Sequence, residues 1–389
     1  MKNKASTLLK GNIRQYVMVI ALVVVIILFQ VLTNGVLLKP LNVSNLISQN
    51  AYILILAIGM LLCILTGGNV DLSVGSVAGF VGAISAIMML KMNIPVVPTI
   101  IVSLLLGLII GCWQGFWIAY VGVPAFIATL AGMLIFRGLT LVVLQGTSLA
   151  PLPADYTFLA SGFLPGIATV GGLNLMAILL GLIASVLYIL RELNNRKNKK
   201  KYGFEVSPNT IFIPQLAGIV LVINAFAFSL ASYQGIPMVL VIVIVLVLIY
   251  SFITMKTIPG RHIYAFGGNS KAAQLSGVNT KKVMFWVYAN MGVMAALAGV
   301  IFTGRLNSAT PKSGVNFELD AIAACFIGGA STSGGIGTIV GAMVGGLLMG
   351  VLNNGMSIMG ISIDWQQTIK GFVLLAAVAF DVYSKSKSK

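Results

Sequence analysis

Acidic residues are scarce in this sequence of 389 residues, which has 8 Asp and Glu in total, one His and three Cys. It contains no HExxH, GxSxG or Walker A motif, which excludes the zinc-protease, serine-hydrolase and P-loop ATP sites that these motifs build. Cys63, Cys112 and Cys325 lie far apart within apolar runs, which is typical of small buried hydrophobic residues and not of a metal pair. We therefore expect no catalytic residue, no metal site and no cofactor bound by this chain.

Charge of either sign is also rare, at 8% of residues against about 25% in a soluble domain, while 58% of residues are hydrophobic and the mean hydropathy is +1.03. Repeated apolar runs of about 20 residues predict helices that cross a bilayer. Twelve segments qualify: 16–37, 46–66, 72–90, 98–120, 125–144, 171–190, 211–231, 237–255, 283–303, 319–333, 336–355 and 365–383. The sequence thus predicts an all-α, polytopic membrane protein with one transmembrane domain over 1–389.

Most of the 24 Lys and Arg residues gather at four places, namely both termini, residues 191–201 and residues 256–282. Twelve crossings put all four places on one side, and an excess of Lys and Arg marks that side as cytoplasmic. The segment 319–333 is short for a span, so a count between ten and twelve stays open. The net charge of +16 is then a topology signal, since no module is present that would fold and bind nucleic acid.

The few acids lie mostly at predicted span ends or in loops, and none is expected in the middle of a span. A carrier coupled to protons or ions generally places ionisable groups inside its bundle. Their expected absence there favours a passive pore, or one powered from outside the chain.

The stretch LTGGNVDLSVGSVAG interrupts two apolar runs with Gly67, Gly68, Asn69, Asp71 and Ser73. One interpretation is that Asp71 caps the following helix. The other is that the break exposes backbone polar groups to a water-filled path, with Asn69, Asp71 and Ser73 along it.

A second irregular region reads NFELDAIAACFIGGASTSGGIGTIVG, from Asn316 to Gly341, and predicts a short or broken helix followed by a tight turn. Downstream, Asn353 and Asn354 end a span and are further candidates for the path. Gly107, Gly111 and Gly115 recur every four residues, which places them on one helix face and predicts close contact with another helix.

Trp113 and Trp117 are also four residues apart. They are candidates for lining or gating the path, with anchoring at the membrane interface as the alternative.

The stretch GRHIYAFGGNSKAAQLSGVNTKK, from Gly260 to Lys282, contains no acid. Asn269 or Ser270 is placed to cap a short helix through Leu275, Gly277 to end it, and Thr280 to cap the next span. The result is a compact element that would fit a cleft in a soluble partner. An ordinary positively charged loop is the alternative.

Five motifs, in order, carry a family resemblance: LTGGNVDLSVGS, VPAFIATLAGMLIFRGL, IYAFGGNSKAAQLSGV, FELDAIAACFIGGASTSGGIGT and GVLNNGMSIMGISIDWQQTIKG. The chain resembles the membrane permeases of bacterial ABC importers for monosaccharides, and within them the xylose and multiple-sugar branch. The resemblance covers about 45–381 and implies a type II importer-like fold. Simpler ribose-type permeases have about ten spans, so 171–235 is an added two-helix region with a basic cytoplasmic loop at 191–201.

The resemblance also implies partners. A second permease subunit (a homodimer), a cytoplasmic ATPase carrying ATP and Mg²⁺, and an extracytoplasmic sugar-binding protein would complete the importer in the bacterial cytoplasmic membrane. Segment 256–282 corresponds to the family's coupling loop. Its expected docking residues are Gly267, Gly268, Asn269, Lys271, Ala272, Leu275 and Gly277. A permease for a nucleoside or a branched-chain amino acid, or an autonomous facilitator, remains the alternative.

Overall fold

The computed structural model describes residues 13–204, 206 and 208–386, and this part of the chain is almost entirely helical. The helices are α2 (Ile13–Leu32), α3 (Pro40–Leu65), α4 (Val74–Leu90), α5 (Val96–Phe116), the π-helix η1 (Trp117–Val121), α6 (Ala125–Leu144), α7 (Ala154–Ser161), α8 (Leu175–Lys201), α9 (Asn209–Ala231), α10 (Met238–Lys256), α11 (Ile258–Gly268), α12 (Ser270–Leu275), α13 (Thr280–Leu306), α14 (Phe317–Ile327), α15 (Ile339–Ile358) and α16 (Ile363–Ser386). The strands β1 (Thr169–Val170) and β2 (Leu173–Asn174) form a small hairpin before α8.

Eight of the described helices are long and apolar enough to cross a membrane, and α4 and the 18–32 part of α2 are shorter apolar helices. The predicted all-α polytopic fold is confirmed. Lys2, Lys4, Lys10, Lys387 and Lys389, which belong to the two terminal basic clusters, lie outside the described residues.

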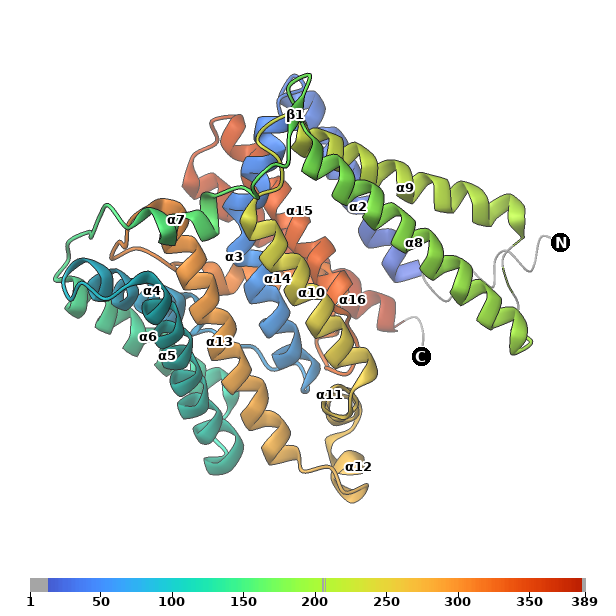
Figure 1. The fold of residues 1–389 in the computed structure, drawn as a ribbon. Helices are drawn as coiled ribbons and strands as arrows, with labels where there is room; N and C mark the ends of the chain where they lie inside the picture. The colour runs from blue at the N-terminus through green and yellow to red at the C-terminus, as the bar shows by residue number, and fades with distance from the viewer. Residues whose placement is uncertain (1–12, 205, 207, 387–389) are drawn as a thin grey trace.

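Helix α3 forms the centre of the bundle, and α13, α15, α14 and α10 pack around it (Figure 1). It is apolar around most of its circumference from Ala51 to Leu65, and all of these residues except Tyr52 are buried. Lipid also satisfies an apolar helix surface, so the central place of α3 follows from the four helices packed around it and not from its hydrophobicity alone.

The glycines at 107, 111 and 115 form the predicted helix interface, and their partner is α13. A Cβ at Gly111 would lie 2.5 Å from the carbonyl oxygen of Tyr288, and one at Gly107 would lie 2.5 Å from that of Gly292. The backbones of α5 and α13 therefore touch directly, as expected for small residues at helix contacts in membranes.

The predicted span 319–333 is a shorter helix, α14, of 11 residues. At 1.5 Å per residue it is about 16 Å long, roughly half of the hydrocarbon core. The turn after α14 returns to the end of α3, where the Gly335 N–H donates to the Leu65 carbonyl at 3.0 Å.

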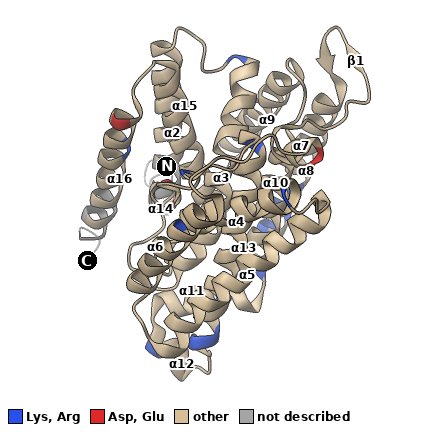
Figure 2. Ribbon diagram, turned by 90° about the vertical axis from the view of Figure 1, so that its left-hand side faces the viewer, with Lys and Arg blue, Asp and Glu red and all other residues tan. Residues whose placement is uncertain are grey.

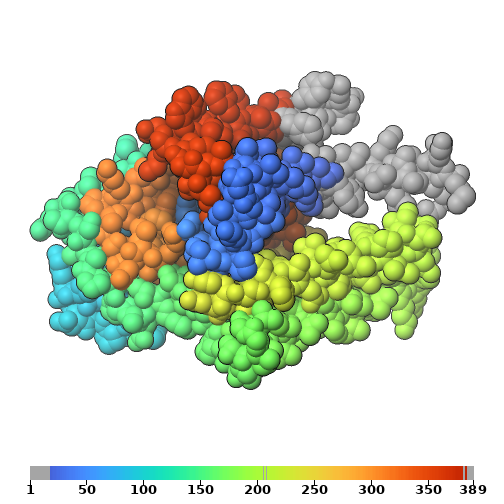
Figure 3. All heavy atoms as spheres, turned by 90° about the horizontal axis from the view of Figure 1, so that it is seen from above, coloured from blue at the N-terminus to red at the C-terminus, as the bar shows by residue number. Residues whose placement is uncertain are grey.

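The region 171–235 is built mainly from α8 and α9, which pack on each other and extend to one side of the bundle (Figures 1 and 3). The basic stretch 191–201, expected as a loop, instead continues α8 to Lys201. Long Lys and Arg side chains have good helix propensity, so the charged stretch extends the helix.

Candidate translocation core and coupling segment

The predicted coupling segment is a pair of short helices, α11 and α12, at one end of the bundle (Figure 1). Helix α11 is an element that the sequence analysis did not foresee. Asn269 caps α12, since its Oδ1 accepts from the Ala272 N–H at 3.0 Å. Gly277 follows α12 with a left-handed φ of +87°, as predicted. The cap of α13 is Asn279, whose Oδ1 accepts from Lys282 N–H at 2.9 Å, so the assignment of this role to Thr280 is wrong.

The outer surface of α12 is open to solvent in the described chain. The Leu275 side chain is 90% exposed, and Lys271 and Ala272 are also exposed. Ala273, on the opposite side of α12, is buried, so this side of the helix packs against the rest of the chain.

The inner surface of α11 meets the core of the bundle. A Cβ at Gly267 would lie 1.7 Å from the Leu65 carbonyl oxygen, so only glycine allows this contact with the end of α3. The Tyr264 hydroxyl donates to the Gly337 carbonyl at 2.6 Å. Burial raises the pKa of Tyr264, which keeps the hydroxyl protonated as a donor. Movement of α11 would therefore act directly on the end of α3 and on the turn before α15.

The break between α3 and α4 holds Asn69, Asp71 and Ser73. Asp71 is buried, and its Oδ1 accepts from the Ser73 N–H at 2.8 Å and from the Ser73 hydroxyl at 2.6 Å. Gln114 on α5 donates to Ser73 Oγ at 2.6 Å. Asp71 thus stabilises the turn before α4 through Ser73, and the Asn69 amide donates to the Thr66 carbonyl at 2.7 Å.

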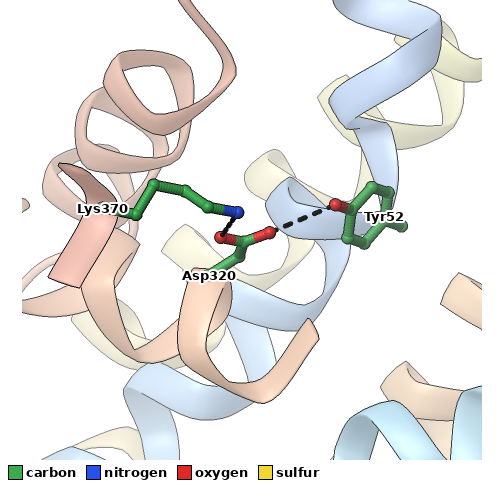
Figure 4. Close-up of polar contacts among 3 residues, drawn as sticks. All are labelled: Tyr52, Asp320 and Lys370. Carbon is green, nitrogen blue, oxygen red and sulfur yellow. Dashed lines mark hydrogen bonds and ion pairs between the residues drawn. The ribbon is translucent and has the colours of Figure 1, made fainter. Parts of the chain in front are cut away.

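Two carboxylates begin α14 and are nearly buried, with Glu318 at 5% and Asp320 at 4% exposure. Lys370 on α16 forms an ion pair with Asp320 at 2.9 Å, and the Tyr52 hydroxyl donates to the second oxygen of Asp320 at 3.2 Å (Figure 4). Arg137 on α6 lies 4.0 Å from Glu318. Acids in the first turn of α14 are also stabilised by its helix dipole.

Both carboxylates lie inside the bundle, whereas no acid was expected in the middle of a span. Gly75 touches Glu318, and one turn further along α4, Ala78 touches Gly299 of α13. Glu318 is therefore level with the middle of α13, which is 27 residues long. The acids do lie at helix ends, as predicted, but α4 and α14 both begin inside the bundle.

Asn353 and Asn354 lie near the far end of α15. Asn354 is buried and exchanges hydrogen bonds with Asn42, at 2.8 Å and 3.1 Å. This amide pair joins the end of α15 to the start of α3. The neighbouring Asn353 oxygen is buried without a hydrogen-bond partner in the described chain.

Trp113 and Trp117 are 39% and 40% exposed on the outer side of α5 and η1. Trp113 packs edge-on against Phe136 of α6, and Trp117 against Phe116. Their position on the surface is typical of membrane-interface anchors.

The candidates thus fall into separate groups. Gly75, two residues after Ser73, contacts Glu318, so Asp71 and Ser73 lie near this carboxylate. Asn353 and Asn354 lie at the opposite end of α3 from Asn69. Tyr52, Gln114 and Lys370 were not predicted from the sequence. Lys370 had a signal of its own, because it is a cation within the predicted span 365–383, and Arg137 within 125–144 had the same signal.

Comparison with known proteins gives a family match over residues 42–378, to the model described as branched-chain amino acid transport system / permease component. The xylose transport system permease protein of Haemophilus influenzae is 39% identical over 97% of this chain and 98% of its own length. The corresponding protein of Escherichia coli is 38% identical over 97% of this chain and 94% of its own length. The ribose import permease protein of Bacillus subtilis is 36% identical over 93% of this chain and 91% of its own length.

No solved structure matches the chain. The family match spans most of the chain, including the break at Asn69–Ser73, the α11–α12 segment and the α14 carboxylates. The chain therefore belongs to this family of transport-system permease components, and it is a transporter subunit, not an enzyme.

Proposed function

We propose that this chain is the membrane permease of an ATP-driven importer for a monosaccharide, with a pentose of the xylose type as the first candidate. The observation that carries the proposal is 39% identity to a xylose permease over nearly the full length of both chains. A neutral, polyhydroxylated substrate requires hydrogen bonding along its path but no strong charged site. Affinity then resides in an extracytoplasmic binding protein that delivers the sugar.

Energy would enter through α11 and α12, where a cytoplasmic ATPase binds. The exposed Leu275 and Lys271, on a turn held by the Asn269 cap and Gly277, support this assignment. The contacts of Gly267 with Leu65 and of Tyr264 with Gly337 supply a route from that surface into the bundle. ATP and Mg²⁺ would be bound on the partner.

A second copy of this chain would complete the pathway. Between α14, α15 and α16 lies a cavity of about 90 Å³ that is lined in part by Asn316, Asp320, Gln367 and Lys370. Polar groups at membrane depth are poorly suited to face lipid. A neighbouring subunit across this opening would enclose them in a polar path.

The bacterial cytoplasmic membrane is the proposed location, with both termini in the cytoplasm. Helices α8 and α10 both start near the β1–β2 hairpin and both end in basic stretches. Figure 2 shows Lys and Arg near α12, and further Lys and Arg at several other places along the ribbon. Contact of these cations with anionic lipid follows from the same orientation.

A branched-chain amino acid is the second candidate, because charged groups do lie at membrane depth. Glu318 and Arg137 would be positioned for an ammonium and a carboxylate. Their charges are already opposed within 4.0 Å, however, and Asp320 is paired with Lys370, which leaves less for a zwitterion than for hydroxyl groups.

The test is uptake by proteoliposomes containing the chain, its ATPase and its binding protein, loaded with ATP and offered xylose, ribose, galactose, a nucleoside and leucine separately. We expect accumulation of a pentose or hexose. Accumulation of leucine or of the nucleoside alone would replace the sugar assignment.

A further inference from the structure

A cleft between α10 and α13, beside the coupling segment, is not used by the function proposed above. Its volume is about 520 Å³, and it is lined by residues of α3, α10, α11 and α13 and by the turn around Gly277. Leu62, Ile263 and Val287 form a buried apolar floor. From its position the cleft belongs to the same end of the bundle as α12.

Three residues of α13 line this cleft at a spacing of four, which puts Lys282, Trp286 and Asn290 on one helix face. Lys282 lies in the first turn of α13, and Asn290 lies eight residues further, about 12 Å deeper along the axis. Trp286, between them, is 55% exposed. The lining thus changes from cationic at the mouth, through an aromatic wall, to an amide at the inner end.

Charge at the mouth is of one sign. Lys282 lines it, and the whole segment from 256 to 282 contains Lys and Arg but no Asp or Glu. An anionic group bound there would therefore meet positive charges and no negative charge from this segment. Basic pockets between helices on the cytoplasmic side are suited to anionic lipid headgroups.

The inner end of the cleft has an unused donor. Tyr250 on α10 donates to the Oδ1 of Asn290, while the Asn290 Nδ2 is buried with no acceptor in the described chain. This Nδ2 is buried too deeply to contact an occupant of the cleft, so the choice of occupant depends on Lys282 and on the apolar floor. A soluble anion would leave the apolar floor unfilled, and a sugar would leave Lys282 without a counter-charge.

We propose that this cleft is a binding site for an anionic phospholipid of the cytoplasmic leaflet, with its headgroup at Lys282 and an acyl chain along Trp286 and Val287. The proposal rests on the cytoplasmic assignment of segment 256–282 made above. A lipid bound there fills the space between α10 and α13 directly behind the coupling helices and would brace their position.

The test uses the full-length chain alone in phosphatidylcholine vesicles, without partners, so it does not depend on transport. Tryptophan fluorescence is quenched by brominated phosphatidylglycerol or by brominated phosphatidylcholine, and the Trp286→Phe variant isolates the contribution of Trp286. We expect about a fivefold preference of the Trp286 site for phosphatidylglycerol, the effect of one Lys near a lipid surface. Lys282→Gln should remove the preference, whereas Lys281→Gln, which makes the same charge change one residue outside the lining, should keep it.

Equal quenching by both lipids, or an equal loss in both Lys variants, would overturn the proposal in favour of ordinary surrounding lipid. Displacement of the brominated lipid by soluble glycerol phosphate would identify a free-anion site, and displacement by xylose would identify a sugar exit. Either displacement would also contradict the lipid assignment. Failure of sugar uptake in the reconstituted importer would leave this result unaffected.

Discussion

Asp320, Lys370 and Tyr52 come from three helices and meet at one carboxylate inside the bundle (Figure 4). Burying a carboxylate is costly unless it is paired and hydrogen-bonded, and both of its oxygens have a partner here. The ion pair between Asp320 and Lys370 mainly contributes specificity of packing, because it holds α16 against α14. Helix α16 otherwise stands at the side of the bundle (Figure 2).

Removing one member of this pair should therefore destabilise the protein more than removing both. Asp320→Asn and Lys370→Gln each leave an uncompensated charge, and we expect a loss of about 3 kcal/mol in the free energy of unfolding for each. The double variant should lose less than either single variant, because it leaves no uncompensated charge. Equilibrium unfolding in mixed micelles measures all three.

The matched control is Asp364→Asn, an identical change at an exposed acid at the start of α16. It should alter stability by about 0.5 kcal/mol or less. Strict additivity of the two single variants would show that Asp320 and Lys370 do not interact energetically.

Among the elements, the contact of α5 with α13 depends on the absence of side chains. Gly111→Ala places a Cβ within 2.8 Å of two backbone carbonyl oxygens of α13, which cannot move without separating the helices. We expect a loss of about 1–3 kcal/mol in the free energy of unfolding.

Gly138→Ala on α6 is the control, since a Cβ there meets nothing within 4 Å. In a helix this change is intrinsically favourable by up to about 1 kcal/mol. If both alanine variants were equally stable, the close approach of α5 and α13 would not contribute to the fold.

The coupling helices give a prediction about function without a change in folding. Leu275→Asp puts a charge on a side chain that makes almost no contact within the chain, so insertion and thermal stability should be unchanged. ATP-driven uptake should fall by about tenfold or more, as for the loss of an apolar anchor at an interface. Leu275→Met keeps an apolar side chain of similar size and should retain uptake. Equal uptake by the Asp and Met variants would remove Leu275 from the docking surface.

The elements that the sequence predicted well are those with a strong local signal. Long apolar runs located the helices, the Gly107–Gly111–Gly115 spacing identified a contact face, and Asn269 and Gly277 marked the ends of α12. The short α14 was visible as a doubtful span, because its apolar run is followed by a glycine-rich turn. Helix α11 was missed because Pro259 and three glycines resemble a loop in sequence.

The site was less predictable, because its contacts join residues far apart in the chain. Lys370 and Asp320 are 50 positions apart, and Tyr52 and Asp320 are 268 apart. Local sequence cannot indicate that α4 and α14 both begin inside the bundle, since that follows from packing of Gly75 and Gly314. The sequence signal for this site was the presence of two cations, Arg137 and Lys370, within predicted spans.

For the molecule as a whole, the proposed docking surface and the polar core are connected through few residues. Leu275 lies on the outside of α12, which follows α11 in sequence. In α11, Gly267 contacts the Leu65 end of α3, and Tyr264 contacts the turn before α15. The same α3 carries Tyr52, which contacts Asp320. A partner that moves α11 would thus act on the helix at the centre of the bundle.

The most direct test of this account is sugar uptake by sealed proteoliposomes that contain the permease with or without its ATPase and binding protein, each with and without enclosed ATP. The account predicts accumulation of the sugar above the outside concentration only when both partners and ATP are present. Equilibration of the sugar through the permease alone, in vesicles free of ATP, would contradict it and would identify the chain as an autonomous facilitator.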